Sequence, residues 1–270
     1  MHITVLSDNN GTETLAGEWG LSILIEHGAL RILLDAGASD RFMKNAAALG
    51  KDLSGLDFAV LSHAHYDHAD GFVPLLRANP ALKVYVRACT EANCYADKEN
   101  GMEYIGVAPA LVEEFEDRLV RVDGDCELAG GVWLIPHKAR HRSKIGARER
   151  MYVKGCCNLY PDDFSHEQSL VFETQQGLCI FNSCSHAGAS EIIGEVCDAF
   201  PGQRVHAYVG GFHLYRRTPE EAEAFAGRLA ERGVERILTG HCTGDEAFAI
   251  LKARLGDRID RFRVGLETDV

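Results

Sequence analysis

The segment LSHAHYDHADG, residues 61 to 71, constrains the fold of this chain more than any other stretch. Directly after the apolar run FAVLS it places four candidate metal ligands in six positions, namely His63, His65, Asp67 and His68. In a packed core each imidazole would need a hydrogen-bond partner and the carboxylate would need a counter-charge. Histidine with carboxylate is a ligand set that suits zinc, iron or manganese. We therefore expect one or two divalent metal ions to hold this segment at the end of a strand.

Elsewhere, short apolar runs alternate with helix-like patterns, which is typical of a mixed α/β protein. Strands are predicted at MHITVLS, LSILIE, RILLDAG, FAVLS, SLVFET, GLCIFNS, VHAYVG, RILTG and RFRVG, and a hairpin turn is predicted at Gln175-Gln176-Gly177. Helices are predicted over 40–49, 188–199, 219–232 and 245–255. The pattern weakens from about 88 to 165, so we expect a single domain over residues 1–270 with a long insertion there.

Charge, length and cysteine content exclude several classes of protein. A net charge of −12 over 270 residues argues against a general nucleic-acid binder, because phosphate binding depends on lysine and arginine. No run approaches the roughly 18 apolar residues of a membrane span, and MHITVLSDNN lacks the features of a signal peptide. Nine cysteines, an odd number in a long chain, favour reduced thiols. We expect a cytoplasmic location without a nucleic-acid or membrane partner, and a homo-oligomer remains open.

One basic run stands out from the acidic background. Between residues 138 and 154, Glu149 is the single acidic residue among seven basic ones, which are Lys138, Arg140, Arg142, Lys144, Arg148, Arg150 and Lys154. Two interpretations stay open, a solvated loop or a lid that attracts an anion over a site. In the second, Arg140 and Arg142 would contact an anionic substrate, because arginine pairs with phosphate oxygens through two hydrogen bonds.

Three later histidines also follow predicted strands. His186 comes after GLCIFNS, and His241 comes after RILTG. A lone histidine at a strand end is more often a surface residue. Here, however, two further histidines follow strand ends as the first cluster does, and this repetition favours metal ligands. Two roles stay open for His213, in VGGFHLY: it contacts the substrate or a metal ligand, or it only packs against its neighbours.

The combined pattern resembles the metallo-β-lactamase superfamily. The resemblance rests on His63-x-His65-x-Asp67-His68 after a strand, on Asp35 in LLDAG before it, and on His186 and His241 after it. It implies a four-layer αββα sandwich with a dinuclear metal site. It also implies a first ligand set of His63, His65 and His186, a second set of Asp67, His68 and His241, and a buried supporting role for Asp35.

Within that superfamily, LSHAHYDHADG, CSHAG, GGFHL and GHCTG are similar to a subgroup labelled as synthases of 7,8-dihydropterin-6-methyl ribofuranosylaminobenzene phosphate in methanogens. One position departs from the superfamily pattern, because Cys184 stands roughly where many members place a bridging aspartate. Three roles stay open for Cys184: a soft metal ligand, a thiol that supports a ligand, or a residue without a role at the site. Asp8, in LSDN, is open between an oxygen ligand or substrate contact and a turn residue.

The resemblance implies a metal-dependent hydrolase, and the basic run from Lys138 to Lys154 favours a small substrate that is phosphorylated or otherwise anionic. A metal-bound hydroxide would attack, Asp67 would orient the water, and His213 or a metal-bound water would protonate the leaving group. We favour zinc over manganese or iron. The alternatives are a pterin-type transferase, in which an arene attacks in place of water, and a non-catalytic metal or ligand sensor. We expect a flavodiiron-type oxidoreductase less than these, because residues 1–270 include no flavodoxin-like part and its usual extra carboxylate ligands are not evident.

Overall fold

The computed structural model describes residues 1–138 and 143–270, whose strands form two seven-stranded sheets and one four-stranded sheet. These residues divide into two compact units. The first comprises residues 1–123, 264–269 and the described residues 143–167; the second comprises the described residues 124–138, then 168–263 and Val270. Each unit pairs one seven-stranded sheet with its own helices, so the predicted mixed α/β class is confirmed.

The sheet of the first unit has the order β18-β1-β2-β3-β4-β5-β8. Its strands are β1 (His2–Ser7), β2 (Ser22–His27), β3 (Leu30–Leu34), β4 (Phe58–Val60), β5 (Val84–Arg87), β8 (Leu119–Val122) and β18 (Glu267–Asp269). Strands β18 to β3 pair antiparallel, and β3 to β8 pair parallel. Its helices are α1 (Arg41–Ala48), α2 (Tyr66–Ala69), α3 (Phe72–Ala78), α4 (Pro109–Glu114) and the 3-10 turn η1 (Glu116–Arg118).

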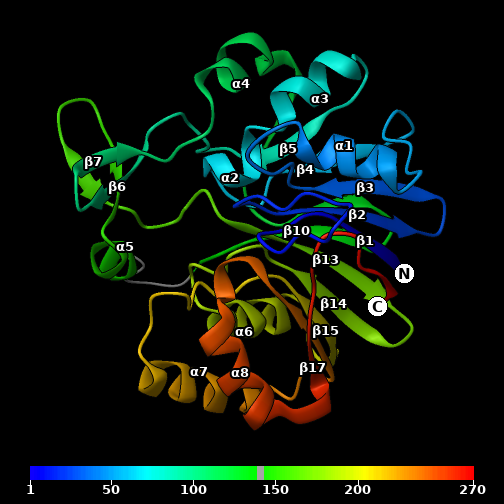
Figure 1. Cartoon of the computed structure of the whole chain (residues 1–270), viewed down its shortest axis with the longest axis vertical. Coiled ribbons are helices and arrows are strands. Elements are labelled where there is room, and N and C mark those ends of the chain that lie inside the picture. The colour runs from blue at the N-terminus through cyan, green and yellow to red at the C-terminus, as the bar shows by residue number, and fades with distance from the viewer. Residues whose placement is uncertain (139–142) are drawn as a thin grey trace. The chain divides into compact units, whose positions relative to one another are not determined.

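Alternation along the strands builds the first core. Leu24 of β2 and Leu33 of β3 join Phe42 of α1 and Phe72 of α3 in one buried apolar cluster. Residues two apart on a strand share a face, so this face of the sheet is the one covered by α1 and α3, as Figure 1 shows. Burial of these side chains contributes about 1.5–3 kcal/mol each.

The weakly patterned segment over 88–165 is rich in regular structure. It holds β6 (Cys94–Lys98), β7 (Gly101–Tyr104), β9 (Cys126–Ala129), β10 (Val132–Pro136), α5 (Ser143–Glu149), β11 (Met151–Lys154) and β12 (Leu159–Pro161), besides α4 and β8. Strands β12, β11, β6 and β7 form the four-stranded sheet, whereas β8 extends the first large sheet and β9 and β10 belong to the second. The prediction of one domain with an insertion stays a prediction.

The sheet of the second unit has the order β17-β16-β15-β14-β13-β10-β9. The remaining strands are β13 (Gln168–Thr174), β14 (Gly177–Phe181), β15 (Val205–Val209), β16 (Arg236–Thr239) and β17 (Ile259–Arg261). Its helices are α6 (Ala189–Ala199), α7 (Pro219–Glu231), α8 (Asp245–Leu255) and the 3-10 turns η2 (His241–Thr243) and η3 (Gly256–Arg258). Strands β14 to β17 run parallel, and all three α-helices pack on one face through a second apolar cluster (Figure 1).

Most element predictions in this half are confirmed, and one is wrong. Thr174 pairs with Gly177 across the predicted hairpin, and α6, α7 and α8 match the predicted helices. The strand predicted at RFRVG ends at Arg261. Gly265 then has φ +81°, a conformation that breaks an extended run, and Phe262 is fully buried against Gly240 instead of alternating in a sheet. No helix among the described residues combines the length and apolar character that crossing a bilayer requires.

Parallel strands bring their carboxyl ends to one edge of a sheet, and the candidate ligands follow such ends. Strand β3 leads into Asp35, and β4 leads into the histidine loop, which we define as residues 61–71. In the second unit, β14, β15 and β16 lead into the segments that carry His186, His213 and His241. Loops after the carboxyl ends of parallel strands are where α/β folds place ligand sites.

Candidate metal centre

Asp35 organises the histidine loop of the first unit. Its Oδ1 accepts the Ser62 backbone N–H at 2.7 Å, and its Oδ2 accepts both the Ser62 hydroxyl and His68 Nδ1, each at 2.7 Å. The Ser62 Oγ in turn lies 2.8 Å from His63 Nδ1. Since the serine proton goes to Asp35, the oxygen is left to accept from the His63 ring. One buried carboxylate therefore sets the orientation of two imidazoles.

This arrangement fits a divalent ion. With Nδ1 of His63 and His68 acting as donors, the lone pair of each ring sits on Nε2, the atom then available to a metal. His68 Nε2 lies 3.6 Å from Asp67 Oδ2, which is close to the roughly 3–4 Å between neighbouring ligands of a zinc ion bound at about 2 Å. The His63 ring centroid is 4.6 Å from that of His65 and 4.2 Å from that of His68.

Burial keeps His65 in its metal-binding form. Desolvation by burial lowers the pKa of His65 to about 3, even though Asp67 favours the charged ring. The neutral imidazole is the form that coordinates a metal. The first unit thus brings together the rings of His63, His65 and His68 and the carboxylate of Asp67.

Neutral hydrogen bonds position the corresponding loop of the second unit. The Asn182 Oδ1 accepts the Ser185 backbone N–H at 2.7 Å, and the Ser185 hydroxyl contacts Tyr208 OH at 2.7 Å and the Gly211 carbonyl oxygen at 2.6 Å. His186 follows, and it is 4% exposed. Its ring centroid lies 4.4 Å from that of His213.

A pair of thiols lies beside His241 in the same unit. Ligand atoms of Cys184, His241 and Cys242 lie within 4.8 Å of one another, and the two sulfur atoms are 3.4 Å apart. The His213 backbone N–H donates to Cys242 Sγ at 3.3 Å. Burial alone would raise the pKa of Cys242, but its contact with Cys184 and the charge of His241 outweigh burial and lower that pKa to about 6. Thiolate is the form of cysteine that binds soft metals.

Backbone strain marks the same positions. Asp35, Ser185, His213 and His241 have φ of 56°, 56°, 48° and 46°, in the left-handed region that side chains other than glycine rarely adopt. Such conformations cost about 1–3 kcal/mol each and persist where the surroundings fix them, frequently at functional sites. All four follow strand ends and carry or support a candidate ligand.

Comparison with known proteins identifies the family of this chain. A family model described as the metallo-β-lactamase superfamily matches residues 20–141. The crystal structure of Tm1679, described as a metal-dependent hydrolase of the β-lactamase superfamily, is 30% identical, covers 100% of this chain and 99% of that chain, and has a TM-score of 0.85. The chain belongs to the metallo-β-lactamase superfamily. The predicted resemblance and fold class are therefore confirmed, and the superfamily fold implies binding of a divalent metal.

Two curated relatives of this superfamily member come from Methanocaldococcus jannaschii. One, named as 7,8-dihydropterin-6-methyl-4-(β-D-ribofuranosyl)-aminobenzene-5'-phosphate synthase, is 25% identical over 259 residues, which is 91% of this chain and 88% of the relative. The other is an uncharacterised protein, 27% identical over 260 residues, which is 92% of this chain and 93% of the relative.

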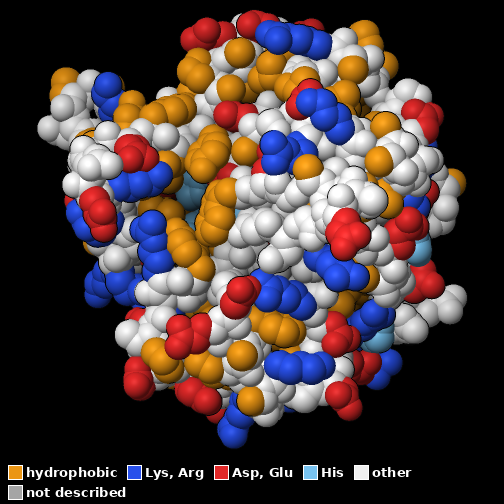
Figure 2. Space-filling view, in the orientation of Figure 1, with side chains coloured by type: hydrophobic (Ala, Val, Ile, Leu, Met, Phe, Trp, Pro, Cys, Tyr) orange, Lys and Arg blue, Asp and Glu red, His pale blue; other side chains and the backbone are white. Residues whose placement is uncertain are grey.

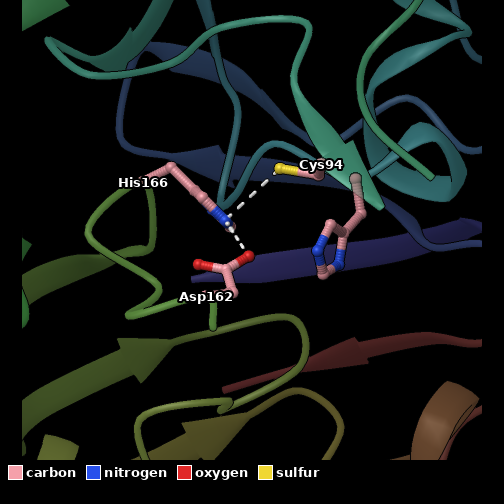
Figure 3. Close-up of side chains that lie close together, drawn as sticks. Cys94, Asp162 and His166 are labelled. Carbon is pink, nitrogen blue, oxygen red and sulfur yellow. Dashed lines mark hydrogen bonds and ion pairs between the residues drawn. The ribbon is translucent and has the colours of Figure 1, made fainter. Parts of the chain in front are cut away.

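Sequence reasoning missed one buried group of polar side chains in the first unit. Ligand atoms of His65, Cys94, Asp162 and His166 lie within 4.8 Å of one another, and all four residues are buried. Figure 3 shows the Cys94, Asp162 and His166 side chains pointing toward one another. His166 Nε2 is 3.0 Å from Asp162 Oδ2 and 3.7 Å from Cys94 Sγ. The sequence signal that could have revealed this group is the spacing Asp162-x-x-x-His166 just before a strand.

Three further residues were predicted at the site, namely Asp8, Arg140 and Arg142. Asp8 Oδ1 accepts the Asn10 backbone N–H at 2.8 Å and the Asn10 side-chain amide at 3.0 Å, as a turn residue does. Arg140 and Arg142 lie outside the described residues.

Acidic partners accompany the basic run. Lys138 pairs with Asp125 at 2.7 Å, and Arg150 pairs with Asp97 at 2.8 Å, besides a contact of Arg148 with Glu149. On the face that Figure 2 shows, Lys and Arg side chains lie interspersed with Asp and Glu instead of forming a continuous basic surface. The charge available to attract an anion is therefore smaller than the sequence run indicates.

Proposed function

We propose that this superfamily member is a metal-dependent hydrolase of a small anionic, phosphorylated substrate. The observation that carries the proposal is the Asp35 network, which leaves Nε2 of His63 and His68 as metal donors beside Asp67. Tm1679, described as a metal-dependent hydrolase, supports it through 30% identity along the whole chain. The proposed cofactor is one or two divalent ions, with zinc favoured over manganese or iron.

The proposed ligand sets are those that the resemblance implies, His63, His65 and His186 for one ion and Asp67, His68 and His241 for the other. Bound divalent ions activate water near neutral pH and stabilise developing negative charge. In the proposal the Asp67 carboxylate orients the attacking water by accepting a hydrogen bond. His213 donates a proton to the leaving group. The proposed contacts of Arg140 and Arg142 with a substrate anion concern residues outside the described part of the chain.

A second candidate function is transfer to an arene acceptor. The relative named as a dihydropterin ribofuranosylaminobenzene phosphate synthase covers most of this chain at 25% identity, and it supports this alternative. Both candidates use a phosphorylated substrate whose phosphate or diphosphate departs. They differ in the nucleophile, which is water in the hydrolase and the aromatic ring in the transferase.

One assay separates these candidates. Protein loaded with zinc, manganese or ferrous iron is incubated with phosphate esters, diphosphate esters and a pterin diphosphate, each with and without an aminobenzene acceptor. A hydrolase releases phosphate or diphosphate equally in both arms, whereas a transferase requires the acceptor and yields a coupled product. Turnover absent from every arm, with metal bound, would overturn both and favour a sensor.

Metal content of a matched pair tests the proposed centre itself. Protein purified without chelator is expected to hold two equivalents, and His68→Ala is expected to hold about one, because one ligand set loses a member. His206→Ala is the control, because His206 belongs to neither proposed ligand set and pairs with Glu235 at 2.9 Å. Equal metal content in the His68 variant and the parent would contradict the assignment.

A further inference from the structure

We propose that Asp162 and His166 are positioning residues that fix the histidine loop by holding the backbone amide of Ala64. The inference rests on the proposed function, since the loop is taken to bind metal. It adds to the Asp35 network a second, independent support that comes from the segment between the four-stranded sheet and β13.

The contact lies between two candidate ligands. The Ala64 N–H donates to His166 Nδ1 at 3.1 Å, and Ala64 separates His63 from His65 in the chain. Ala64 is 1% exposed and His166 is 4% exposed, so water cannot readily replace the bond. A buried amide that loses its acceptor destabilises the folded loop, because no water takes the acceptor's place. The His166 ring also packs edge-on against His65, with centroids 5.4 Å apart.

This contact determines which nitrogen of His166 carries the proton. Because Nδ1 accepts from Ala64, the proton sits on Nε2, which donates to Asp162 Oδ2 at 3.0 Å. The Asp162 carboxylate raises the pKa of His166 against the cost of burial, but a second proton on Nδ1 would face the Ala64 N–H. The hydrogen bond from Ala64 therefore favours a His166 ring with a single proton, on Nε2.

Asp162 is itself held firmly. Its Oδ1 accepts the Phe164 backbone N–H at 2.7 Å, and its own N–H donates to the Met151 carbonyl oxygen of β11 at 2.9 Å. Helix α5 approaches the Asp162 backbone so closely at Gly146 that an added Cβ would lie 2.1 Å from the Asp162 carbonyl oxygen. The pair is thus anchored to the four-stranded sheet and to α5.

The same four side chains have the composition of a metal site, and the hydrogen bonds argue against that assignment. A metal-bound histidine normally donates through its other ring nitrogen. If His166 Nε2 bound a metal, Nδ1 would have to carry the proton, yet it faces the Ala64 donor. The arrangement is that of a carboxylate–histidine pair with the Cys94 thiol beside it.

Isosteric variants test the proposal. In Asp162→Asn the amide oxygen stays with the Phe164 N–H, which turns the NH₂ group toward His166 Nε2. The ring must then carry its proton on Nδ1, against Ala64, and zinc affinity is expected to fall about 10–100-fold, the range for the loss of such supporting contacts. His166→Leu is expected to do the same. In His166→Asn the side-chain oxygen replaces Nδ1, so that the Ala64 bond and most of the affinity are retained.

Two readouts besides activity separate the possible outcomes. Hydrogen exchange of the 61–71 peptide in metal-free protein is expected to rise in Asp162→Asn and His166→Leu and to stay near the parent in His166→Asn. Zinc competition titrations then give affinity and stoichiometry. Cys94→Ala is the matched control, with parental values of both expected.

Loss of one zinc equivalent in the Cys94 variant would overturn the proposal in favour of a metal site. Parental exchange and affinity in Asp162→Asn and His166→Leu would overturn it as well. A parent protein that binds zinc, shows these differences and lacks turnover would refute the hydrolase while leaving the positioning role intact.

Discussion

The histidine loop at 61–71 and the second loop, residues 182–188, both carry candidate ligands after a strand, yet different chemistry holds them. Carboxylates support the first, Asp35 directly and Asp162 through His166. The amide of Asn182 and the hydroxyls of Ser185 and Tyr208 support the second directly, and the Glu195 carboxylate reaches it through His137 and Asn182. A carboxylate fixes which ring nitrogen carries a proton, whereas a neutral amide fixes the course of the backbone. Substituting a residue that supports the first loop should therefore lower metal affinity. Substituting one that supports the second should mainly lower the free energy of unfolding.

Asp35→Asn should produce the largest effect. An amide cannot accept the Ser62 N–H, the Ser62 hydroxyl and the His68 ring together, so buried donors lose their partner. We expect the free energy of unfolding to fall by about 1–3 kcal/mol for each buried donor left without a partner. Zinc affinity should fall about 100-fold, at the upper end for a supporting contact. Urea unfolding and zinc titration measure the two quantities.

Asp40→Asn is the control for that experiment. Asp40 is exposed and pairs with Lys44 on the surface of α1 at 2.8 Å, an interaction worth about 0–1 kcal/mol. It should leave both stability and zinc affinity near the parent values. If Asp35→Asn destabilised the protein but bound zinc as the parent does, the coupling assigned to the first loop would be wrong.

Asn182→Ala should have an intermediate effect and a different character. The substitution removes the acceptor of the Ser185 N–H and the donor to His137 Nε2, which lies 2.9 Å from the Asn182 amide. We expect a loss of about 2 kcal/mol in unfolding free energy, because buried polar groups lose their partners. Zinc affinity per folded molecule should fall much less than in Asp35→Asn. A loss of affinity as large as that of Asp35→Asn would erase the distinction between the loops.

The supports of the two loops also differ in how far sequence alone reveals them. Asp35 and the histidine loop were predictable, because both follow short apolar strands that parallel pairing brings to one sheet edge. His166 was not, since it lies 102 residues from the amide it holds and the intervening pattern is weak. The strand expected at RFRVG failed because the left-handed Gly265 and the buried Phe262 interrupt it.

Charge pairing was equally invisible in the sequence. The basic run reads as seven cations against Glu149, but Asp125 and Asp97 approach Lys138 and Arg150 from other strands or turns. Sequence patterns report neighbours along the chain, and these partners are distant along it. The same limit hid the thiol contact between Cys184 and Cys242, which are 58 residues apart.

The smallest effect gives the sharpest comparison, because the two loops each contain a buried serine. Ser62→Ala removes the acceptor of His63 Nδ1, so the ring is less firmly held and zinc affinity should fall about tenfold. Ser185→Ala removes contacts with Tyr208 OH and the Gly211 carbonyl oxygen, which should cost about 1 kcal/mol of unfolding free energy. Its zinc affinity should equal that of the parent. Parallel zinc titrations of the two variants test this expectation. Equal zinc affinities would mean that the serine hydroxyls contribute alike in both loops. The contrast between a loop supported by carboxylates and one supported by neutral groups would then be wrong.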